Sequence, residues 1–144
     1  MSETRALSKV MVVPCSGIGK TYGSVSRESA YIVTEDLRPN ETRLLALSKL
    51  VLGDEEARSA IEGNPAITID GCKLACATKM VVESGGKIAQ DYAVLDVYRR
   101  YRQFKPNGIA ELNEGGEQLA QALADEIAQV VDGLNINESG GSNG

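Results

Sequence analysis

Three short apolar runs along the chain predict buried β-strands. Residues 9–14 form a nearly continuous, largely β-branched run that ends at a proline, residues 66–70 follow an Asn-Pro turn, and residues 92–97 form the third run. A continuous apolar run, in contrast to an alternating one, is typical of a strand that is covered on both faces. Residues 87–90 are either a connector or the start of the third strand.

Segments with the spacing of helices separate these runs. Ser24 and Asp54 are suitable N-caps for two of them, because their side-chain oxygens can accept hydrogen bonds from first-turn amides. Glycines follow residues 52, 62 and 84, where three of the helices are expected to end. In the last helix, leucine, isoleucine and valine recur on one face. The predicted helices cover residues 24–37, 42–52, 55–62, about 73–84 and about 114–134.

Strands that alternate with helices indicate a Rossmann-like α/β fold. We expect a single three-layer domain with a small, mostly parallel sheet of about three to four strands, flanked by helices. The domain is expected over residues 1–134, and the Gly/Ser/Asn-rich residues 135–144 are expected to be a disordered tail. In such folds ligands bind at the carboxyl ends of the strands, near the point where the strand order reverses.

Charge and composition exclude several classes of function. The chain has 20 acidic and 15 basic residues, a net charge of -5, no histidine and no tryptophan. The acidic balance argues against duplex nucleic acid as a partner, and the lack of histidine removes histidine-based triads and metal ligands. No apolar run approaches the ~20 residues that cross a bilayer, and the N-terminus has no signal-peptide pattern. We therefore expect a cytoplasmic protein. In the cytoplasm, clustered cysteines more often bind metal or react than form disulfides.

All three cysteines stand where a predicted strand passes into a helix or a glycine-rich loop. Cys15 follows the strand at 9–14, and Cys72 and Cys76 follow the strand at 66–70. Because the carboxyl ends of parallel strands meet at one edge of a sheet, neighbouring strands would bring the three sulfur atoms together. If the chain between Cys72 and Cys76 is helical, these two also lie on one face, a single turn apart. Amides at a helix N-terminus favour thiolate over thiol.

Three thiolates leave several chemistries open. They can occupy three corners of a tetrahedral zinc site, with Asp70, water, a substrate thiol or another subunit at the fourth. They can equally hold an iron–sulfur cluster with one open iron. Without a permanent metal, Cys15, Cys72 and Cys76 could serve thiol redox chemistry or sulfur transfer, one as nucleophile and another as resolving thiol. Inert, buried cysteines are the remaining alternative.

The two cysteine segments resemble one known family. The run PCSGIGK at 14–20, together with DGCKLAC at 70–76, is similar to the DGC-domain proteins, which are named for their Asp-Gly-Cys motif. The resemblance extends over nearly the whole chain except its tail. It implies zinc binding through four chelating cysteines and no characterised biochemical role. Cys15, Cys72 and Cys76 match three of these cysteines.

The chain departs from this family pattern at the fourth cysteine. It has only three cysteines, and the missing one is expected around residues 46–48. A closed site of four thiolates is usually structural, whereas an open site is usually reactive. The departure therefore favours an open or partly vacant zinc site, with an iron–sulfur cluster as the alternative, and with Asp70 either as the fourth ligand or just outside the ligand sphere.

The glycine-rich segment after Cys15 resembles phosphate-binding loops only in part. The run GKT at 19–21 ends like a P-loop, but Pro14 stands where that motif begins with glycine. Small tyrosine phosphatases and arsenate reductases have an arginine six positions after their cysteine, where this chain has Thr21. A simple strand-to-helix turn is one interpretation. The other is a cradle for an anion formed by Ser16, Gly17, Gly19 and Lys20.

The expected partners are therefore a metal ion and a small thiol or anion, and neither a membrane nor nucleic acid. The basic residues within 99–105 are expected to be solvated, with an acidic partner or RNA as the alternative. The sequence assigns no catalytic residue and no oligomeric state.

Overall fold

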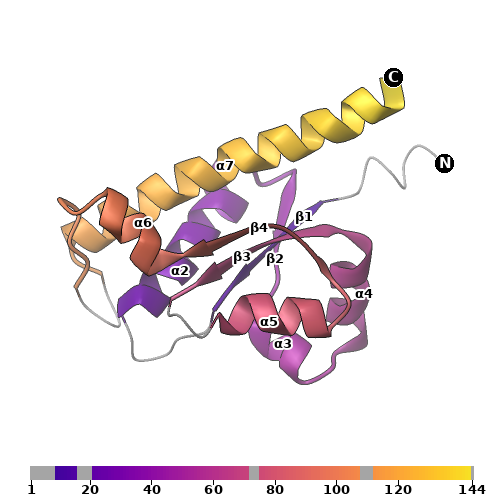
Figure 1. The fold of residues 1–144 in the computed structure, drawn as a ribbon, viewed down its shortest axis with the longest axis horizontal. Coiled ribbons are helices and arrows are strands. Elements are labelled where there is room, and N and C mark those ends of the chain that lie inside the picture. The colour runs from indigo at the N-terminus through magenta and orange to yellow at the C-terminus, as the bar shows by residue number, and fades with distance from the viewer. Residues whose placement is uncertain (1–8, 16–20, 72–74, 108–111, 144) are drawn as a thin grey trace.

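The computed structural model describes residues 9–15, 21–71, 75–107 and 112–143, with the backbone alone for 135–143. Within these ranges the chain forms one four-stranded sheet with the strand order β2-β1-β3-β4, and every neighbouring pair is parallel (Figure 1). The strands are β1 (Val10–Pro14), β2 (Thr42–Leu44), β3 (Pro65–Asp70) and β4 (Lys87–Ala93). The prediction of a small parallel sheet is confirmed.

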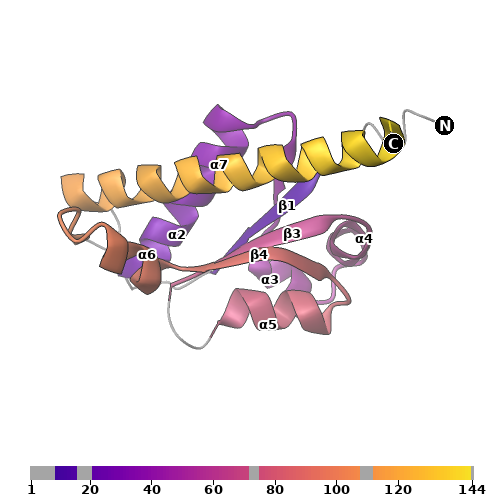
Figure 2. The ribbon, with the colours of Figure 1, turned by 45° about the horizontal axis from the view of Figure 1, so that its top comes forward.

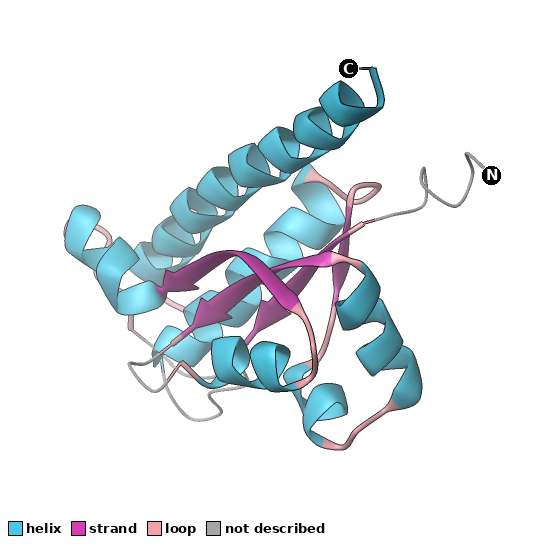
Figure 3. Ribbon diagram, turned by 45° about the vertical axis from the view of Figure 1, so that its right-hand side comes forward, coloured by secondary structure: helices cyan, strands magenta, loops and turns pink. Residues whose placement is uncertain are grey.

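Helices cover both faces of this sheet and give the expected three layers. Their bounds are α2 (Thr21–Tyr31), the π-helix η1 (Ile32–Leu37), α3 (Leu47–Val51), α4 (Glu55–Gly63), α5 (Cys76–Glu83), α6 (Val94–Arg100) and α7 (Glu114–Asn143). α2, η1, α6 and α7 pack on one face, and α3, α4 and α5 pack on the other (Figures 2 and 3). The three-layer α/β architecture predicted from the sequence is confirmed.

The side chains of β1 alternate between two hydrophobic cores. Val10 and Val12 are buried with side chains of α2 and α7, whereas Met11 and Val13 are buried with side chains of α3, α4 and α5. Because successive residues of a strand point to opposite faces, a strand between two helical layers is apolar at nearly every position. Cys15 continues the alternation and lies in the core on the α3–α5 side.

The leucine-rich segment 42–52 is not the single helix that its composition predicts. Thr42–Leu44 is the edge strand β2, paired in parallel with residues 10–12 of β1, and only Leu47–Val51 is helical. Pairing with β1 outweighs the helix propensity of leucine, which is a weak preference. The leucines are also divided between the two cores: Leu44 packs on one side, and Leu45, Leu47 and Leu50 pack on the other.

The predicted third strand is also wrong in its second half. The strand β4 covers Lys87–Ala93, so residues 87–90 are its start, and the helix α6 begins at Val94. Val94 and Val97 are buried three positions apart, which places them on one face of a helix. β4 is an edge strand with mostly exposed or half-buried residues, so it has no apolar run of its own to reveal it.

The N-cap predictions have opposite outcomes. Asp54 caps α4 as expected, and its carboxylate accepts the Ala57 N–H at 2.9 Å. Ser24 is not a cap, because it lies inside α2, which begins three residues earlier at Thr21. The extra turn carries Tyr22, which packs against the core with its ring 6.5 Å from that of Tyr98. This contact packs the first turn of α2 against the core.

The last helix, α7, begins where the sequence predicts and ends later. Asn113 caps it, and its Oδ1 accepts the Gly116 N–H at 2.8 Å. A side chain at Gly115 would collide with the Lys105 carbonyl, which explains a glycine in this first turn. The helix continues to Asn143, past the expected end at 134, since extending a formed helix costs little per residue. The length of α7 does not test the predicted disorder of residues 135–144, which stays a prediction.

Candidate functional site

The carboxyl ends of β1 and β3 lie where the strand order reverses. From β1 the chain moves to β2 on one side and then returns to β3 on the other. The helix that follows β1, α2, covers one face of the sheet, whereas α5, after β3, covers the opposite face. In open α/β sheets, ligands bind at such a switch point.

Cys15 and Gly71 meet at this point. The Cys15 N–H donates to the Ile69 carbonyl at 2.8 Å, which extends the pairing of β1 with β3. The Cys15 Sγ atom accepts the Gly71 N–H at 3.2 Å, although the two residues are 56 positions apart. Cys15 is only 6% exposed. The sulfur of the first motif therefore lies against the backbone of the second, at the residue that precedes Cys72.

Gly71 is enclosed by the first turn of α2. A Cβ atom at this position would lie 2.9 Å from Gly23 N and 3.0 Å from the carbonyl carbon of Tyr22. Both atoms belong to the backbone, so they cannot rotate away as a flexible side chain would. The glycine of the Asp-Gly-Cys motif is thus required for α2 to approach the end of β3.

Ser26 is a second polar neighbour of Cys15, and sequence reasoning missed it. Its hydroxyl lies 2.8 Å from the Gly23 carbonyl, 3.3 Å from the Cys15 carbonyl and 3.9 Å from Cys15 Sγ. A hydroxyl has one hydrogen to donate, and the Gly23 carbonyl is its closest acceptor. Ser26 therefore lies next to the sulfur, while its hydroxyl hydrogen is best placed to bond to the Gly23 carbonyl.

The Asp70 carboxylate holds the N-terminus of α5. Its Oδ1 accepts the Ala77 N–H at 2.7 Å, and its Oδ2 accepts the Thr78 N–H at 3.3 Å and the Thr78 hydroxyl at 2.8 Å. These amides belong to the first turn of α5, where no intrahelical acceptor is available. Asp70 is 3% exposed. Both of its oxygens are thus engaged by the helix that begins with Cys76.

The helix α5 begins later than the sequence predicts. Ala75 has φ 53° and ψ 46°, in the left-handed region, so the α-helix does not include it and starts at Cys76. The prediction that Cys72 and Cys76 lie one helical turn apart required a helix between them, and this requirement is not met at Ala75. Among the described non-glycine residues, Ala75 alone has a positive φ, which costs about 1–2 kcal/mol for an L-residue. Cys76 is exposed, in contrast to the buried Cys15.

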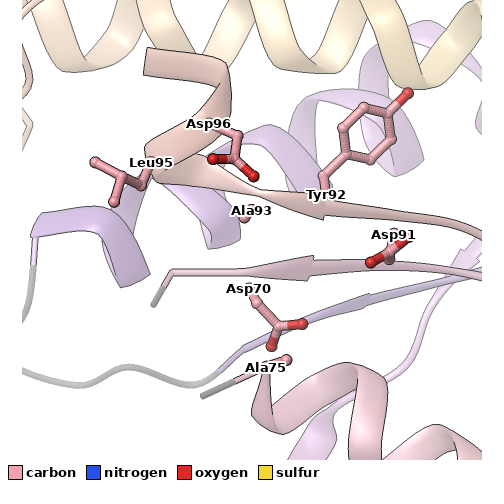
Figure 4. A pocket seen from close by; sticks show the side chains of 7 residues that line it. All are labelled: Asp70, Ala75, Asp91, Tyr92, Ala93, Leu95 and Asp96. Atoms are coloured by element: carbon pink, nitrogen blue, oxygen red, sulfur yellow. The ribbon is translucent and has the colours of Figure 1, made fainter. Parts of the chain in front are cut away.

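A pocket of about 260 Å³ opens beside Ala75, between the ends of β3 and β4 (Figure 4). Figure 4 shows the Tyr92 ring extending toward α7, away from Asp70 and Asp91. Burial raises the pKa of the Tyr92 phenol, so this side chain is neutral over the physiological range. Sequence reasoning gave no signal for this pocket, because the end of β4 at Ala93 and the helix α6 that follows it were not recognised. The described residues that line it are Asp70, Ala75, Asp91, Tyr92, Ala93, Leu95 and Asp96.

Several predicted site residues lie outside the described part of the chain. They are Cys72 and the residues of the expected anion cradle, Ser16, Gly17, Gly19 and Lys20. Within residues 9–15, 21–71, 75–107 and 112–143, no three Cys, Asp or Glu side chains are grouped to hold a metal ion. Cys15 and Asp70 lie at the same edge of the sheet, at the carboxyl ends of β1 and β3. Their joint role with Cys72 and Cys76 in metal binding stays a prediction.

The basic residues within 99–105 are partly neutralised by carboxylates of the same chain. Arg100 forms two contacts with the Glu126 carboxylate of α7, at 2.7 and 3.0 Å, and Arg99 pairs with Asp96 at 3.3 Å. The hydrogen bond to Glu126 raises the pKa of the Arg100 guanidinium. The Tyr101 hydroxyl also donates to Glu126, at 2.9 Å, and this bond raises the pKa of the phenol. The contacts of Arg100 and Tyr101 with Glu126 connect the end of α6 to α7, and the solvated character of this segment stays a prediction.

Comparison with known proteins gives one match. The family model described as DGC domain matches residues 11–132, a range that includes both cysteine segments. No curated protein and no protein of solved structure matches the chain. In the described part of the chain, none of the helices combines the length and the apolar character needed to span a membrane.

Proposed function

Since the chain belongs to the DGC domain family, we propose that it is a metal-binding protein with zinc as the metal and Cys15, Cys72 and Cys76 as ligands. The site would stand at the carboxyl edge of the sheet, at the switch point between β1 and β3. Its open position would accept a small thiol or an anion. A cytoplasmic location is part of the same proposal.

The hydrogen bond from Gly71 to Cys15 Sγ carries this proposal. It joins the two cysteine motifs across 56 residues at 3.2 Å, and backbone N–H donors to sulfur are a usual outer shell of thiolate ligands. Sulfur is also a preferred donor for zinc. The residues around Cys15 therefore fit a metal–thiolate site, as far as the described part of the chain extends.

The geometry of Asp70 favours a supporting role over direct ligation. Its two oxygens accept three hydrogen bonds from Ala77 and Thr78, at 2.7 to 3.3 Å. Three of the about four lone-pair sites of this carboxylate are thereby occupied, so Asp70 has a single remaining site, on Oδ1, for a metal. We therefore assign Asp70 to the outer shell, where it fixes the helix that starts with Cys76.

Zinc with three thiolates keeps a fourth position for an exchangeable ligand, and bound zinc would supply Lewis acidity there. Ser16, Gly17, Gly19 and Lys20 stay the proposed cradle for an anion close to Cys15. An iron–sulfur cluster held by the same three cysteines is the alternative cofactor.

A second candidate function follows from the exposure of Cys76. Its thiol is accessible at the first residue of α5, whereas Cys15 is buried. Accessible cysteines at helix N-termini are the ones that react in thiol redox and sulfur-transfer proteins. In that case Cys15, Cys72 and Cys76 would act without a permanent metal.

Elemental analysis tests the proposal. The full chain is produced with both zinc and iron available, and metal content and visible absorbance are measured on the wild type and on Cys72→Ser. We expect one zinc per chain, no cluster absorbance, and loss of most of the zinc in Cys72→Ser. Far less than one metal per wild-type chain would contradict metal binding, and cluster absorbance would replace zinc by iron and sulfide.

A further inference from the structure

The Cys15 sulfur lies in a buried place with two hydrogen-bond donors beside it. The Gly71 N–H donates to Sγ at 3.2 Å, and the Ser26 hydroxyl lies 3.9 Å from the same atom. Cys15 is 6% exposed and Ser26 is fully buried, so little water reaches the sulfur. A thiolate in such a place needs donors from the protein, because burying a charge without hydrogen bonds is costly.

The Ser26 hydroxyl can leave its nearest acceptor at small cost. Gly23 and Ser26 both belong to α2, so the 2.8 Å bond from the hydroxyl goes to the carbonyl three residues earlier in the same helix. The Gly23 carbonyl also has the helical N–H four residues later, that of Arg27, as a partner. It therefore stays satisfied when the hydroxyl turns away, and such a bond of serine to its own helix adds little stability.

A charged sulfur is the better acceptor for this hydroxyl. Hydrogen bonds to an ionised group are roughly twice as strong as those between neutral groups. A neutral thiol is only a weak acceptor, so beside it the hydroxyl bonds to the Gly23 carbonyl. A metal-bound cysteine is a thiolate, and the preference then changes to Sγ. Because the two acceptors lie 2.8 and 3.9 Å from one oxygen, the change needs a small rotation of the side chain and no movement of α2.

We propose that Ser26 is an outer-shell donor to Cys15, whose hydroxyl turns from the Gly23 carbonyl to Sγ when that sulfur is bound to zinc. Together with the Gly71 N–H, it stabilises the charge of the thiolate and strengthens metal binding. Ser26 is thus a positioning residue of the metal site and not a ligand. This inference rests on the proposed function, because it concerns the same metal. All four residues belong to the described part of the chain.

The zinc affinities of Ser26→Ala and Ser29→Ala, measured on the full chain, test this role. Both serines are fully buried in α2, and each hydroxyl bonds to a carbonyl three residues earlier. Within the described residues, the contact with Cys15 Sγ distinguishes Ser26 from Ser29. Competition with a chelator should show zinc bound about 10- to 100-fold more weakly in Ser26→Ala, the usual effect of losing an outer-shell partner. Ser29→Ala should bind zinc like the wild type.

Urea unfolding of the chelator-treated proteins separates this role from a structural one. Ser26→Ala and Ser29→Ala should lose similar, small amounts of stability, because each loses one bond within α2. Equal zinc affinity of Ser26→Ala and the wild type, or an equal decrease in both variants, would overturn the inference while the zinc site itself stands. A wild-type chain that binds no zinc would contradict the proposed function and this inference with it.

NMR of the wild type provides a test that needs no variant. In the chain loaded with an NMR-active cadmium isotope in place of zinc, scalar coupling passes from the metal through Cys15 Sγ to a proton that is hydrogen-bonded to this sulfur. The Gly71 amide proton is the internal standard, since it already bonds to Sγ. We expect coupling to both the Gly71 amide and the Ser26 hydroxyl proton. Coupling to the Gly71 amide alone would overturn the role of Ser26, and coupling to neither proton would contradict Cys15 as a metal ligand.

Discussion

The Thr78 hydroxyl donates to Asp70 Oδ2 at 2.8 Å, and Thr78 Oγ1 also lies 2.7 Å from Thr68 Oγ1. Because a carboxylate can only accept, Thr78 gives its single hydrogen to Asp70 and must accept the hydrogen of Thr68. Thr68 is fully buried in β3, and Thr78 lies in the first turn of α5. A short chain of hydrogen bonds therefore ties the strand to the helix that begins with Cys76.

This chain of bonds predicts a cost for Thr78→Val, which keeps the shape of the side chain and removes its hydroxyl. Asp70 loses one donor and Thr68 loses its acceptor, so we expect the free energy of unfolding to fall by about 1–3 kcal/mol. Urea unfolding measures it. Thr34→Val is the matched control, because its hydroxyl only donates to the Ala30 carbonyl within the same helical stretch. Equal losses for the two variants would contradict the role of the network.

Gly71→Ala should be disruptive out of proportion to its one added methyl group. The new Cβ would lie 2.9 Å from Gly23 N, so the first turn of α2 must move, and we expect a loss of about 1–3 kcal/mol in unfolding free energy. The displacement would also lengthen the Gly71–Cys15 hydrogen bond. Gly63→Ala is the control, since nothing lies within 4 Å of the Cβ that it adds. A Gly71→Ala protein as stable as Gly63→Ala would disprove the close approach.

Ala75→Gly should stabilise the protein. Glycine adopts the left-handed conformation of this residue without a Cβ clash, and the relief exceeds the added entropy of the unfolded chain, for a net gain of about 0.5–1 kcal/mol. Ala77→Gly, in the interior of α5 and buried, should instead destabilise by about 1 kcal/mol or more. Thermal unfolding of the two variants against the wild type measures both effects. A lower melting temperature for Ala75→Gly would show that the left-handed conformation is not strained.

The ion pair of Arg38 with Asp132 predicts a pH dependence. The guanidinium contacts both carboxylate oxygens at 2.7 Å and connects the end of η1 to α7. Its hydrogen bond lowers the pKa of the Asp132 carboxyl below the usual value of 3.8. A lowered pKa in the folded state contributes stability above the unfolded pKa and loses it as the pH falls through the folded pKa.

The measurement for this pair is the stability difference between the wild type and Asp132→Asn as a function of pH. The wild type should be more stable at neutral pH, and the difference should vanish as the pH falls below the ordinary aspartate range. Because the pair is partly exposed, high salt should also reduce the difference. A difference that is constant from neutral to acidic pH would exclude a contribution from the charge of Asp132.

The buried elements could be predicted from the sequence because their patterns are local. The apolar runs of β1 and β3 reflect their position between two helical layers, and the cap at Asp54 is a short-range motif. The approach of Cys15 to the Asp-Gly-Cys segment also followed from one general rule, that parallel neighbours end at the same edge.

The edge strands and the contacts of the site could not be predicted in this way. Leu44 lies in a segment with the composition of a helix, and only its pairing with Val12 of β1 shows that it belongs to a strand. Val94 continues an apolar run, and only the structure shows that it begins α6. The hydrogen bonds that Asp70 accepts from Ala77 and Thr78 depend on the late start of α5, which the left-handed Ala75 sets. No sequence pattern predicts a left-handed backbone conformation for an alanine.

X-ray absorption at the zinc edge tests the central claim most directly, because it counts the sulfur atoms around the metal. On the zinc-loaded full chain we predict three sulfur ligands at about 2.3 Å, falling to two when Cys15 is replaced by serine. A zinc shell made only of oxygen or nitrogen atoms in the wild type would contradict this claim. A sulfur count that Cys15→Ser leaves unchanged would also contradict a zinc site shared by Cys15 and the Cys72/Cys76 segment.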